Sequence, residues 1–295
     1  MPQNRRALLL GLTAVLLWST VATAFKLALR YLDVFQLLFY ATLSSAAVLL
    51  LVLSLRRSLP ELLLNLREAP GYFLGMALLN PCCYYLVLLS AYDRLPAQQA
   101  QAINYTWAIT LSLLAIPVLK QPLKGRDLVA AGGGYLGVLV IATRGDIASL
   151  DFDSPAGVAL ALFSTLLWAL YWLASARNHR DAAVSLCLMF MLAVPVTGLL
   201  CVVFSSLSAP GWQGLAAAVY VGFFEMGITF MLWAAALRTA SRVALVGNLI
   251  FLSPFLSLVF IQWVLGEQVH PATLVGLVLI VPAALWQQME QPAAA

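Results

Sequence analysis

Residues 14–30 read AVLLWSTVATAFKLALR, and residues 164–180 read STLLWALYWLASARNHR. Both segments are long and apolar, and they align without a gap at an offset of 150. The identical pairs are Leu16/Leu166, Leu17/Leu167, Trp18/Trp168, Ala24/Ala174 and Arg30/Arg180 at this offset, followed by Ala91/Ala235, Arg94/Arg238 and Asn104/Asn248 at an offset of 144. Matches of Ala and Leu are common by chance in apolar helices. The matched Trp, Arg and Asn residues indicate an internal duplication.

The composition of the chain excludes a soluble globular protein. Of its 295 residues, 63% are hydrophobic and 9% are charged, whereas soluble domains carry about 25% charged residues. Most of the surface must therefore face a lipid bilayer. The formal net charge of +4 does not indicate a nucleic-acid partner, because the basic residues are scattered between apolar runs.

Ten segments are long and apolar enough to cross a membrane, since a transmembrane helix needs about 20 apolar residues. The predicted spans are 7–27, 36–55, 70–91, 97–119, 127–143, 155–176, 182–206, 213–235, 242–264 and 271–288. They leave short loops and no room for a soluble domain. The sequence therefore predicts an all-α polytopic membrane protein with ten transmembrane helices.

The duplication divides the spans into two sets of five, in residues 1–150 and 151–295. Because five is an odd number, the second set enters the membrane from the opposite side to the first. Such inverted repeats are typical of secondary transporters, whose halves rearrange around a central site near the midplane. Of the sixteen Lys and Arg residues, 12 fall on the side of the N-terminus and 4 on the other side. This asymmetry predicts that both termini are cytoplasmic.

Three short motifs extend the pattern. They are Arg-Leu-Pro-Ala at 94–97, Arg-Thr-Ala-Ser at 238–241 and Leu-Gly-Glu at 265–267. With the two Leu-Leu-Trp triplets, their order and spacing resemble the EamA-type drug/metabolite transporter superfamily, and within it the bacterial exporters of aromatic amino acids. The resemblance covers nearly the whole chain. It departs at Lys-Gln-Pro 120–122, where the family usually has a Gly-Glu pair, and we interpret this loop pair as structural.

The resemblance implies a transporter of the bacterial inner membrane with a central cavity between its halves. It implies that spans 1, 3, 4, 6, 8 and 9 wall this cavity and that amino acids or similar small metabolites are the cargo. We expect the protein to function as a single chain. The glycines at 132–134 are not followed by Gly-Lys-Ser/Thr, so they do not form a phosphate loop. They predict close helix packing instead, and transport is expected to be driven by gradients.

Glu225 is the one acidic residue near the middle of a predicted span. An ionisable residue inside a membrane is energetically expensive and marks a functional site by default. Its two candidate roles are proton coupling and binding of a cationic amino group. The alternative is a carboxyl that desolvation keeps protonated and that bonds to a neighbouring helix.

Asn80-Pro81 interrupts the third span, because proline removes a backbone donor and frees a carbonyl group. Tyr84 follows one turn later on the same predicted helix face. This pattern is compatible with a broken helix that lines the cavity and equally with a kink that only shapes packing. Pro254 offers a second helix break in the ninth span.

Polar and aromatic residues of the fourth, sixth and ninth spans complete the candidate site. Trp168 lies well inside its span, away from the interface where Trp is usually found, so it could stack against an apolar cargo or fill the seam between the halves. Polar stripes can likewise serve only to join helices. The predicted substrate-binding residues are Asn80, Tyr84, Asn104, Tyr105, Trp107, Trp168, Glu225 and Asn248, and the predicted helix breaks are Pro81 and Pro254.

The leading hypothesis is a secondary exporter of aromatic and other bulky neutral amino acids that works by alternating access, with proton coupling left open. The alternative within transport is a multidrug or other metabolite carrier on the same scaffold. The alternative of another class is a polytopic membrane enzyme, which would cluster ionisable residues in a pocket; none cluster here. His179 and His270 are isolated and do not make a metal site. No cofactor, metal or catalytic residue is predicted.

Overall fold

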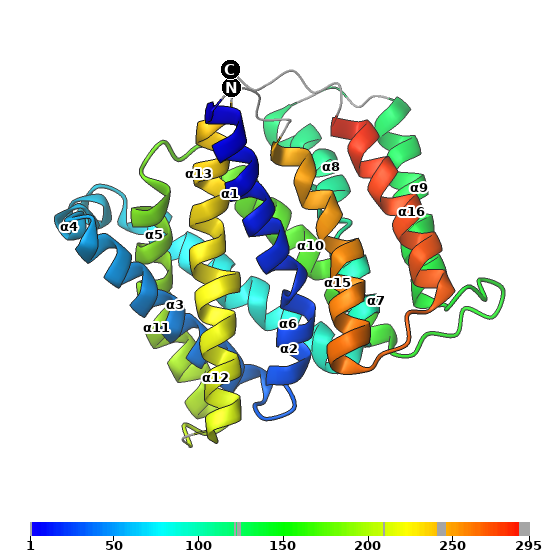
Figure 1. Cartoon of the computed structure of the whole chain (residues 1–295), viewed down its shortest axis with the longest axis horizontal. Coiled ribbons are helices and arrows are strands. Elements are labelled where there is room, and N and C mark those ends of the chain that lie inside the picture. The colour runs from blue at the N-terminus through cyan, green and yellow to red at the C-terminus, as the bar shows by residue number, and fades with distance from the viewer. Residues whose placement is uncertain (1, 121, 123–124, 209, 241–245, 289–295) are drawn as a thin grey trace.

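A computed structural model describes residues 2–120, 122, 125–208, 210–240 and 246–288. Helices make up most of this part of the chain and form one bundle (Figure 1). Eight helical stretches are long and apolar enough to cross a membrane, and Asp127–Ala142 and Pro271–Gln287 are shorter apolar helices. The prediction of an all-α polytopic membrane protein is confirmed.

Several spans consist of successive helical segments. The first half contains α1 (Pro2–Ser19), α2 (Val21–Ala28), α3 (Val34–Leu55), α4 (Leu59–Glu68), α5 (Pro70–Ala77), η1 (Leu78–Cys83), α6 (Tyr84–Arg94), α7 (Ala97–Asn104), α8 (Trp107–Leu119) and α9 (Gly125–Ala142). The second half contains α10 (Pro155–Ser175), α11 (Ala182–Phe204), α12 (Trp212–Tyr220), η2 (Val221–Ile228), α13 (Thr229–Thr239), η3 (Asn248–Leu252), α15 (Ser253–Phe260), η4 (Ile261–Leu265) and α16 (Pro271–Gln288).

Local capping signals set several helix ends. The Asp33 side chain accepts hydrogen bonds from the backbone N–H groups of Phe35 and Gln36, and it forms a capping box at the start of α3. Asp181 accepts equivalent bonds at the start of α11. Gly266 follows η4 with a φ of 73°, a conformation that glycine adopts without steric cost. These ends agree closely with the predicted span limits; the first residues of the predicted span 242–264 lie outside the described residues.

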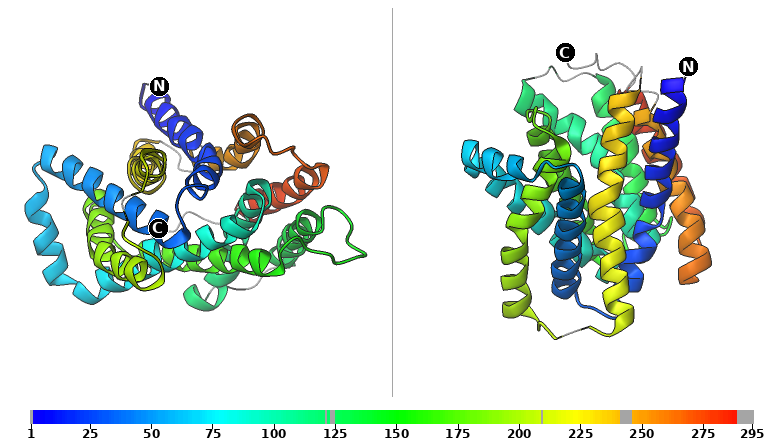
Figure 2. Two further views of the ribbon diagram at one scale, coloured as in Figure 1. Left: turned by 90° about the horizontal axis from the view of Figure 1, so that it is seen from below. Right: turned by 60° about the vertical axis from the view of Figure 1, so that its left-hand side comes forward.

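The helix α4 was not expected, because the sequence analysis predicts only a short loop between the second and third spans. Its ten residues are too few to cross a membrane. Leu62 and Leu66, one helical turn apart, pack against the main hydrophobic core, while Leu63 and Leu64 are exposed. This apolar face holds α4 at one edge of the bundle, opposite α9 and α16 (Figure 2).

The two halves pack against each other in symmetry-related pairs. α3 packs against α11, and α9 packs against α16, so that each pairs with its counterpart from the other half. The contact between α1 and α13 is repeated, with the halves exchanged, between α10 and α6. α1 and α10 run in opposite directions through the bundle (Figure 1). The fold is therefore two inverted five-span repeats.

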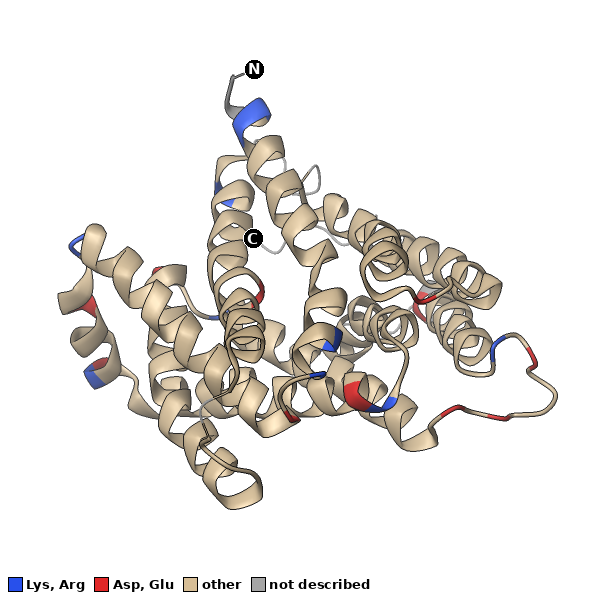
Figure 3. Ribbon diagram, turned by 60° about the horizontal axis from the view of Figure 1, so that its bottom comes forward, with Lys and Arg blue, Asp and Glu red and all other residues tan. Residues whose placement is uncertain are grey.

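The two ends of the bundle contain different segments of the chain. The terminal end contains the start of α1 and the end of α16, and the distal end contains the connection between α6 and α7 (Figure 1). Charged residues gather on helix ends and loops, whereas the middles of the helices are mostly uncharged (Figure 3). Trp212, Trp263 and Trp286 are exposed near span ends, where Trp commonly anchors a protein at the membrane interface.

Candidate functional site

The spans at the centre of the bundle are broken into segments. The π-helical η1 separates α5 from α6, and the π-helical η2 separates α12 from α13. A turn at residues 105–106 separates α7 from α8. The 3₁₀ helix η3 gives way to α15, which has Pro254 in its first turn. Broken helices expose backbone groups and permit bending, so they commonly line the central sites of transporters.

A cavity of about 300 Å³ lies between the two halves, within the usual size range of small-molecule sites. It is lined by residues from spans 1, 3, 4, 6, 8 and 9, the set that the family resemblance implies. The lining residues are Trp18, Val21, Ala22, Phe25, Tyr84, Leu88, Tyr92, Gln101, Asn104, Tyr105, Trp107, Leu111, Trp168, Trp172, Glu225, Phe230, Trp233, Leu237, Gly247 and Ile250. Aromatic side chains thus make up much of the wall.

Six of the eight predicted substrate-binding residues lie on this wall. They are Tyr84, Asn104, Tyr105, Trp107, Trp168 and Glu225. Asn80 is instead buried outside the lining, near Tyr171. Asn248 is exposed at the start of η3, outside the lining as well.

Local backbone geometry explains both departures. Asn80 precedes Pro81 and has non-helical dihedral angles, with φ −143° and ψ 117°. The rule that residues four apart share a face holds only within a regular α-helix, so it does not group Asn80 with Tyr84 across this break. Asn248 begins a 3₁₀ helix with a different angular spacing, and its neighbours Gly247 and Ile250 line the cavity instead.

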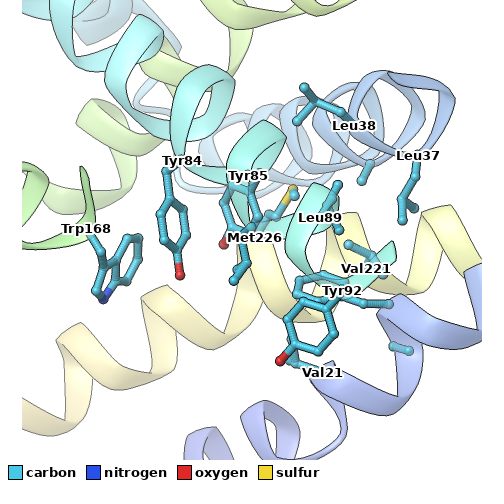
Figure 4. Packing of buried hydrophobic residues seen from close by; sticks show 14 of the residues in the cluster. Val21, Leu37, Leu38, Tyr84, Tyr85, Leu89, Tyr92, Trp168, Val221 and Met226 are labelled. Carbon is cyan, nitrogen blue, oxygen red and sulfur yellow. The ribbon is translucent and has the colours of Figure 1, made fainter. Parts of the chain in front are cut away.

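Trp168 is at the centre of the aromatic wall. Its ring stacks on Tyr84 with centroids 4.4 Å apart and on Tyr171 at 5.2 Å. The ring of Phe230, from α13, meets it edge-on at 5.8 Å. Figure 4 shows Trp168 and Tyr84 side by side. These contacts hold the Trp168 ring in a defined orientation beside the cavity.

Several lining residues were not in the predicted set. Trp18 contacts the rings of Phe230 and Trp233 at 5.4 and 5.5 Å, so it both lines the cavity and joins α1 to α13 across the seam. Trp172 follows Trp168 by one helical turn, which places both on one face of α10. That spacing was a usable signal for Trp172. Nothing comparable in the sequence distinguishes Phe230 and Trp233 from other apolar residues.

Glu225 lies in η2 and is only 8% exposed. The Tyr85 hydroxyl donates a hydrogen bond to its Oε1 atom at 3.1 Å. Its Oε2 atom is buried and has no hydrogen-bond partner among the described residues. A buried acceptor left without a donor costs about 1–3 kcal/mol, so an additional donor would stabilise this oxygen.

The polar residues of the fourth span divide into two groups. Asn104 Nδ2 donates to Ser164 Oγ at 2.9 Å and so joins α7 to α10 beside the cavity. Gln98 lies outside the lining; its Oε1 atom accepts bonds from His270 N and Thr273 Oγ1, at 2.8 and 2.9 Å. Gln98 therefore joins the halves, whereas Asn104 has both a structural bond and access to the cavity.

Ring contacts and hydrogen bonds, one of them between the halves, gather at the distal end of the cavity. Phe25 and Tyr92 form its floor, with ring centroids 5.1 Å apart. Below them Lys26 Nζ donates to the backbone oxygens of Tyr92 and Leu95, at 2.8 and 3.0 Å. Glu267 Oε1, from the other half, accepts a bond at 3.0 Å from the first backbone N–H of α7. We call Lys26, Glu267 and these bonds the distal lock.

The fold and the cavity define a polytopic membrane protein with a central small-molecule site. The model of the EamA-like transporter family matches residues 5–143 and 155–286, and the chain belongs to this family. The protein is therefore a membrane transporter of small molecules. Each half is matched separately, in agreement with the duplication.

Two further comparisons concern individual proteins. No curated protein matches the chain. A solved structure described only as "Crystal structure of protein" is similar to it over 96% of this chain and 97% of its own, with a TM-score of 0.68 and 24% sequence identity. At this identity the likeness shows the fold alone.

Proposed function

We propose that the protein is a secondary transporter that exports aromatic and other bulky neutral amino acids, or related metabolites, by alternating access. The observation that carries the proposal is a cavity of about 300 Å³ whose wall combines stacked aromatic rings with one buried carboxyl group. Rings offer apolar contact and stacking to a bulky side chain, and Glu225 offers an acceptor to an amino group. The resemblance of the sequence to the aromatic amino-acid exporter YddG supports the same cargo.

The two inverted halves, residues 1–150 and 151–295, are the moving units of this mechanism. The distal lock lies at one end of the cavity, and Leu237 lines the cavity nearer the terminal end. The excess of Lys and Arg supports cytoplasmic termini in the bacterial inner membrane, and the distal lock then lies on the periplasmic side. Since residues of one chain line the cavity, we expect a single chain to transport.

Glu225 also supports proton coupling. The ionisable groups that face it are tyrosine hydroxyls, those of Tyr84, Tyr85 and Tyr92 from α6 and of Tyr105. A carboxyl that releases its proton when cargo arrives, and regains it when cargo leaves, exchanges a proton for the cargo. Replacement by Gln keeps the shape of the side chain and the bond from Tyr85 but cannot titrate.

The test is flux of radiolabelled phenylalanine, tryptophan, leucine, methionine and lysine in liposomes that contain the purified protein. We expect saturable flux of the neutral amino acids, accelerated by an imposed pH gradient. Glu225→Gln is expected to abolish the acceleration, because no other carboxyl lines the cavity in the described part of the chain.

Glu61, exposed on α4, provides the matched control, and Glu61→Gln is expected to behave as the wild type. Flux of none of the five amino acids above that of empty liposomes would refute the amino-acid assignment and favour a drug or other metabolite as cargo. Flux that is unchanged by Glu225→Gln over a range of gradients would refute coupling through Glu225.

A further inference from the structure

The described wall of the cavity carries an acidic side chain but no basic one. Glu225 is the charged residue among those that line the cavity, and no Lys, Arg or His belongs to the lining in the described part of the chain. Two basic residues lie outside the lining at the distal end, Lys26, whose ammonium group is held by two backbone oxygens, and Arg30. Both face a separate pocket that also contains Asp93 and Glu267. Among the described residues, a bound molecule therefore meets one acidic group and no basic one.

The free oxygen of Glu225 matches an ammonium group. Oε1 is already bonded to the Tyr85 hydroxyl, whereas Oε2 has no partner in the described residues. An ammonium group carries donors only, and its hydrogen bonds to a carboxylate are about twice as strong as neutral ones. A molecule with a protonated amino group supplies both the missing donor and the balancing charge.

The aromatic wall favours the same kind of molecule. Rings of Trp and Tyr attract cations through their negative faces, and five rings of the lining, those of Trp18, Tyr84, Trp168, Phe230 and Trp233, contact one another in one group. The same rings accommodate the apolar body of an aryl compound.

A carboxylate on the cargo would be bound less well. Its available partners are neutral donors, such as the buried Trp172 Nε1, which has no acceptor among the described residues. Removing a carboxylate from water without a cationic partner is costly. In this cavity the carboxylate would also be repelled by Glu225.

We propose that the cavity recognises the ammonium group of an arylalkyl amine, and that the free carboxylate of an amino acid contributes nothing to binding. The proposal deepens the proposed function and rests on the same cavity. It assigns a cargo class of amines, amides and esters whose amino group is free, with the amino acids as the less favourable members.

Calorimetric titration of the purified full-length protein tests the proposal with three ligands that share one phenyl body. Phenylalaninamide carries only the ammonium group at mildly acidic pH, phenylalanine carries both charges, and 3-phenylpropanoate carries only the carboxylate. We expect the amide to bind at least as tightly as phenylalanine, and 3-phenylpropanoate not to bind. Glu225→Gln is expected to weaken amide binding at least about tenfold.

Two variants separate loss of recognition from loss of structure. Glu61→Gln, on the exposed side of α4, is expected to leave amide binding unchanged. Tyr85→Phe removes the competing donor to Glu225 and is expected to keep amide binding, so binding by this variant and not by Glu225→Gln isolates the carboxylate.

The outcomes distinguish this inference from the proposed function. If phenylalanine binds about tenfold more tightly than its amide, or if 3-phenylpropanoate binds as well as the amide, the inference is wrong while amino-acid export stands. If Glu225→Gln binds the amide like the wild type, the inference is wrong too. Binding of none of the three ligands also overturns it, and the liposome flux of phenylalanine then decides the proposed function separately.

Discussion

Trp168 contacts four aromatic rings, those of Tyr84, Tyr171, Trp172 and Phe230, at centroid separations of 4.4 to 5.8 Å. Each such pair contributes about 0.5–1.5 kcal/mol beyond the burial of its surface. Three of these partners also line the cavity. The contacts that orient Trp168 thus also shape the wall of the cavity.

Replacing Trp168 with alanine is therefore expected to raise the KM for aromatic cargo at least about tenfold, because the cargo loses a stacking surface and the neighbouring rings lose their support. Phenylalanine at this position should cause a smaller increase. Liposome flux at varied cargo concentrations measures the effect. Trp286→Ala, which removes an exposed ring, should leave KM unchanged, and equal KM values for the two alanine variants would contradict the role of Trp168.

At the scale of the element, α9 and α16 show how close packing is achieved. A Cβ atom added at Gly137 would lie 2.7 Å from the backbone oxygen of Gly276, so the two backbones approach through paired glycines. The Gly132–Gly134 run, predicted to serve this purpose, does so only in part. Gly132 has open space around it, whereas Gly134 faces the Ile109 side chain closely. The sequence pattern identified the correct helix but not Gly137, the glycine through which α9 meets the backbone of α16.

This geometry predicts opposite results for two identical substitutions on α9. Gly137→Ala forces α9 away from α16 and should lower the thermal unfolding midpoint in detergent by several degrees, since overpacking costs about 1–3 kcal/mol. Gly132→Ala meets no neighbour and should keep or slightly raise the midpoint, because alanine favours a helix over glycine. Equal midpoints for the two variants would show that the close approach is not required.

At the scale of the whole molecule, the distal lock joins helices of both halves at one end of the cavity. Lys26 ties α2 to the end of α6, and Glu267 from the second half caps α7. The counterpart of Glu267 in the first half, Gln121, lies outside the described residues and is not acidic. The two repeats thus share the order of their spans but differ in the residue at this position, which is Gln121 in one and Glu267 in the other.

Removing the Glu267 side chain, which caps α7, is expected to open the distal end of the cavity more often. Leu88 lines the cavity, and Leu88→Cys can be introduced into a variant that lacks the four native cysteines. The rate at which this cysteine reacts with an impermeant maleimide added on the distal side measures access from that end. Glu267→Ala should increase the labelling rate several-fold, and Glu267→Gln, which still accepts a bond from the α7 N–H, should increase it less. An unchanged rate in both variants would show that the lock does not hold this end closed.

Much of the fold was predictable because its signals are local. A run of about 20 apolar residues identifies a span whatever its partners are, and an odd number of spans per repeat requires inversion. The helix α4 was missed because ten amphipathic residues carry only a weak signal. Tyr84, Trp168 and Glu225 were placed on the wall from their depth and chemistry. Asn80 and Asn248 were predicted to bind substrate as well but lie outside the lining, because depth does not determine which way a residue faces.

The sequence by itself determined an all-helical membrane protein, its internal duplication and the burial of one acidic residue, since composition and spacing decide what can be placed in lipid. Only the tertiary structure decided which side chains face one cavity. The direction in which a side chain points depends on how its helix is rotated about its own axis. The π and 3₁₀ segments η1, η2 and η3 change the angular spacing of residues and so change that direction. The cross-half contacts of Trp18 and Glu267 join residues more than 150 positions apart, and such contacts exist only after the halves have packed.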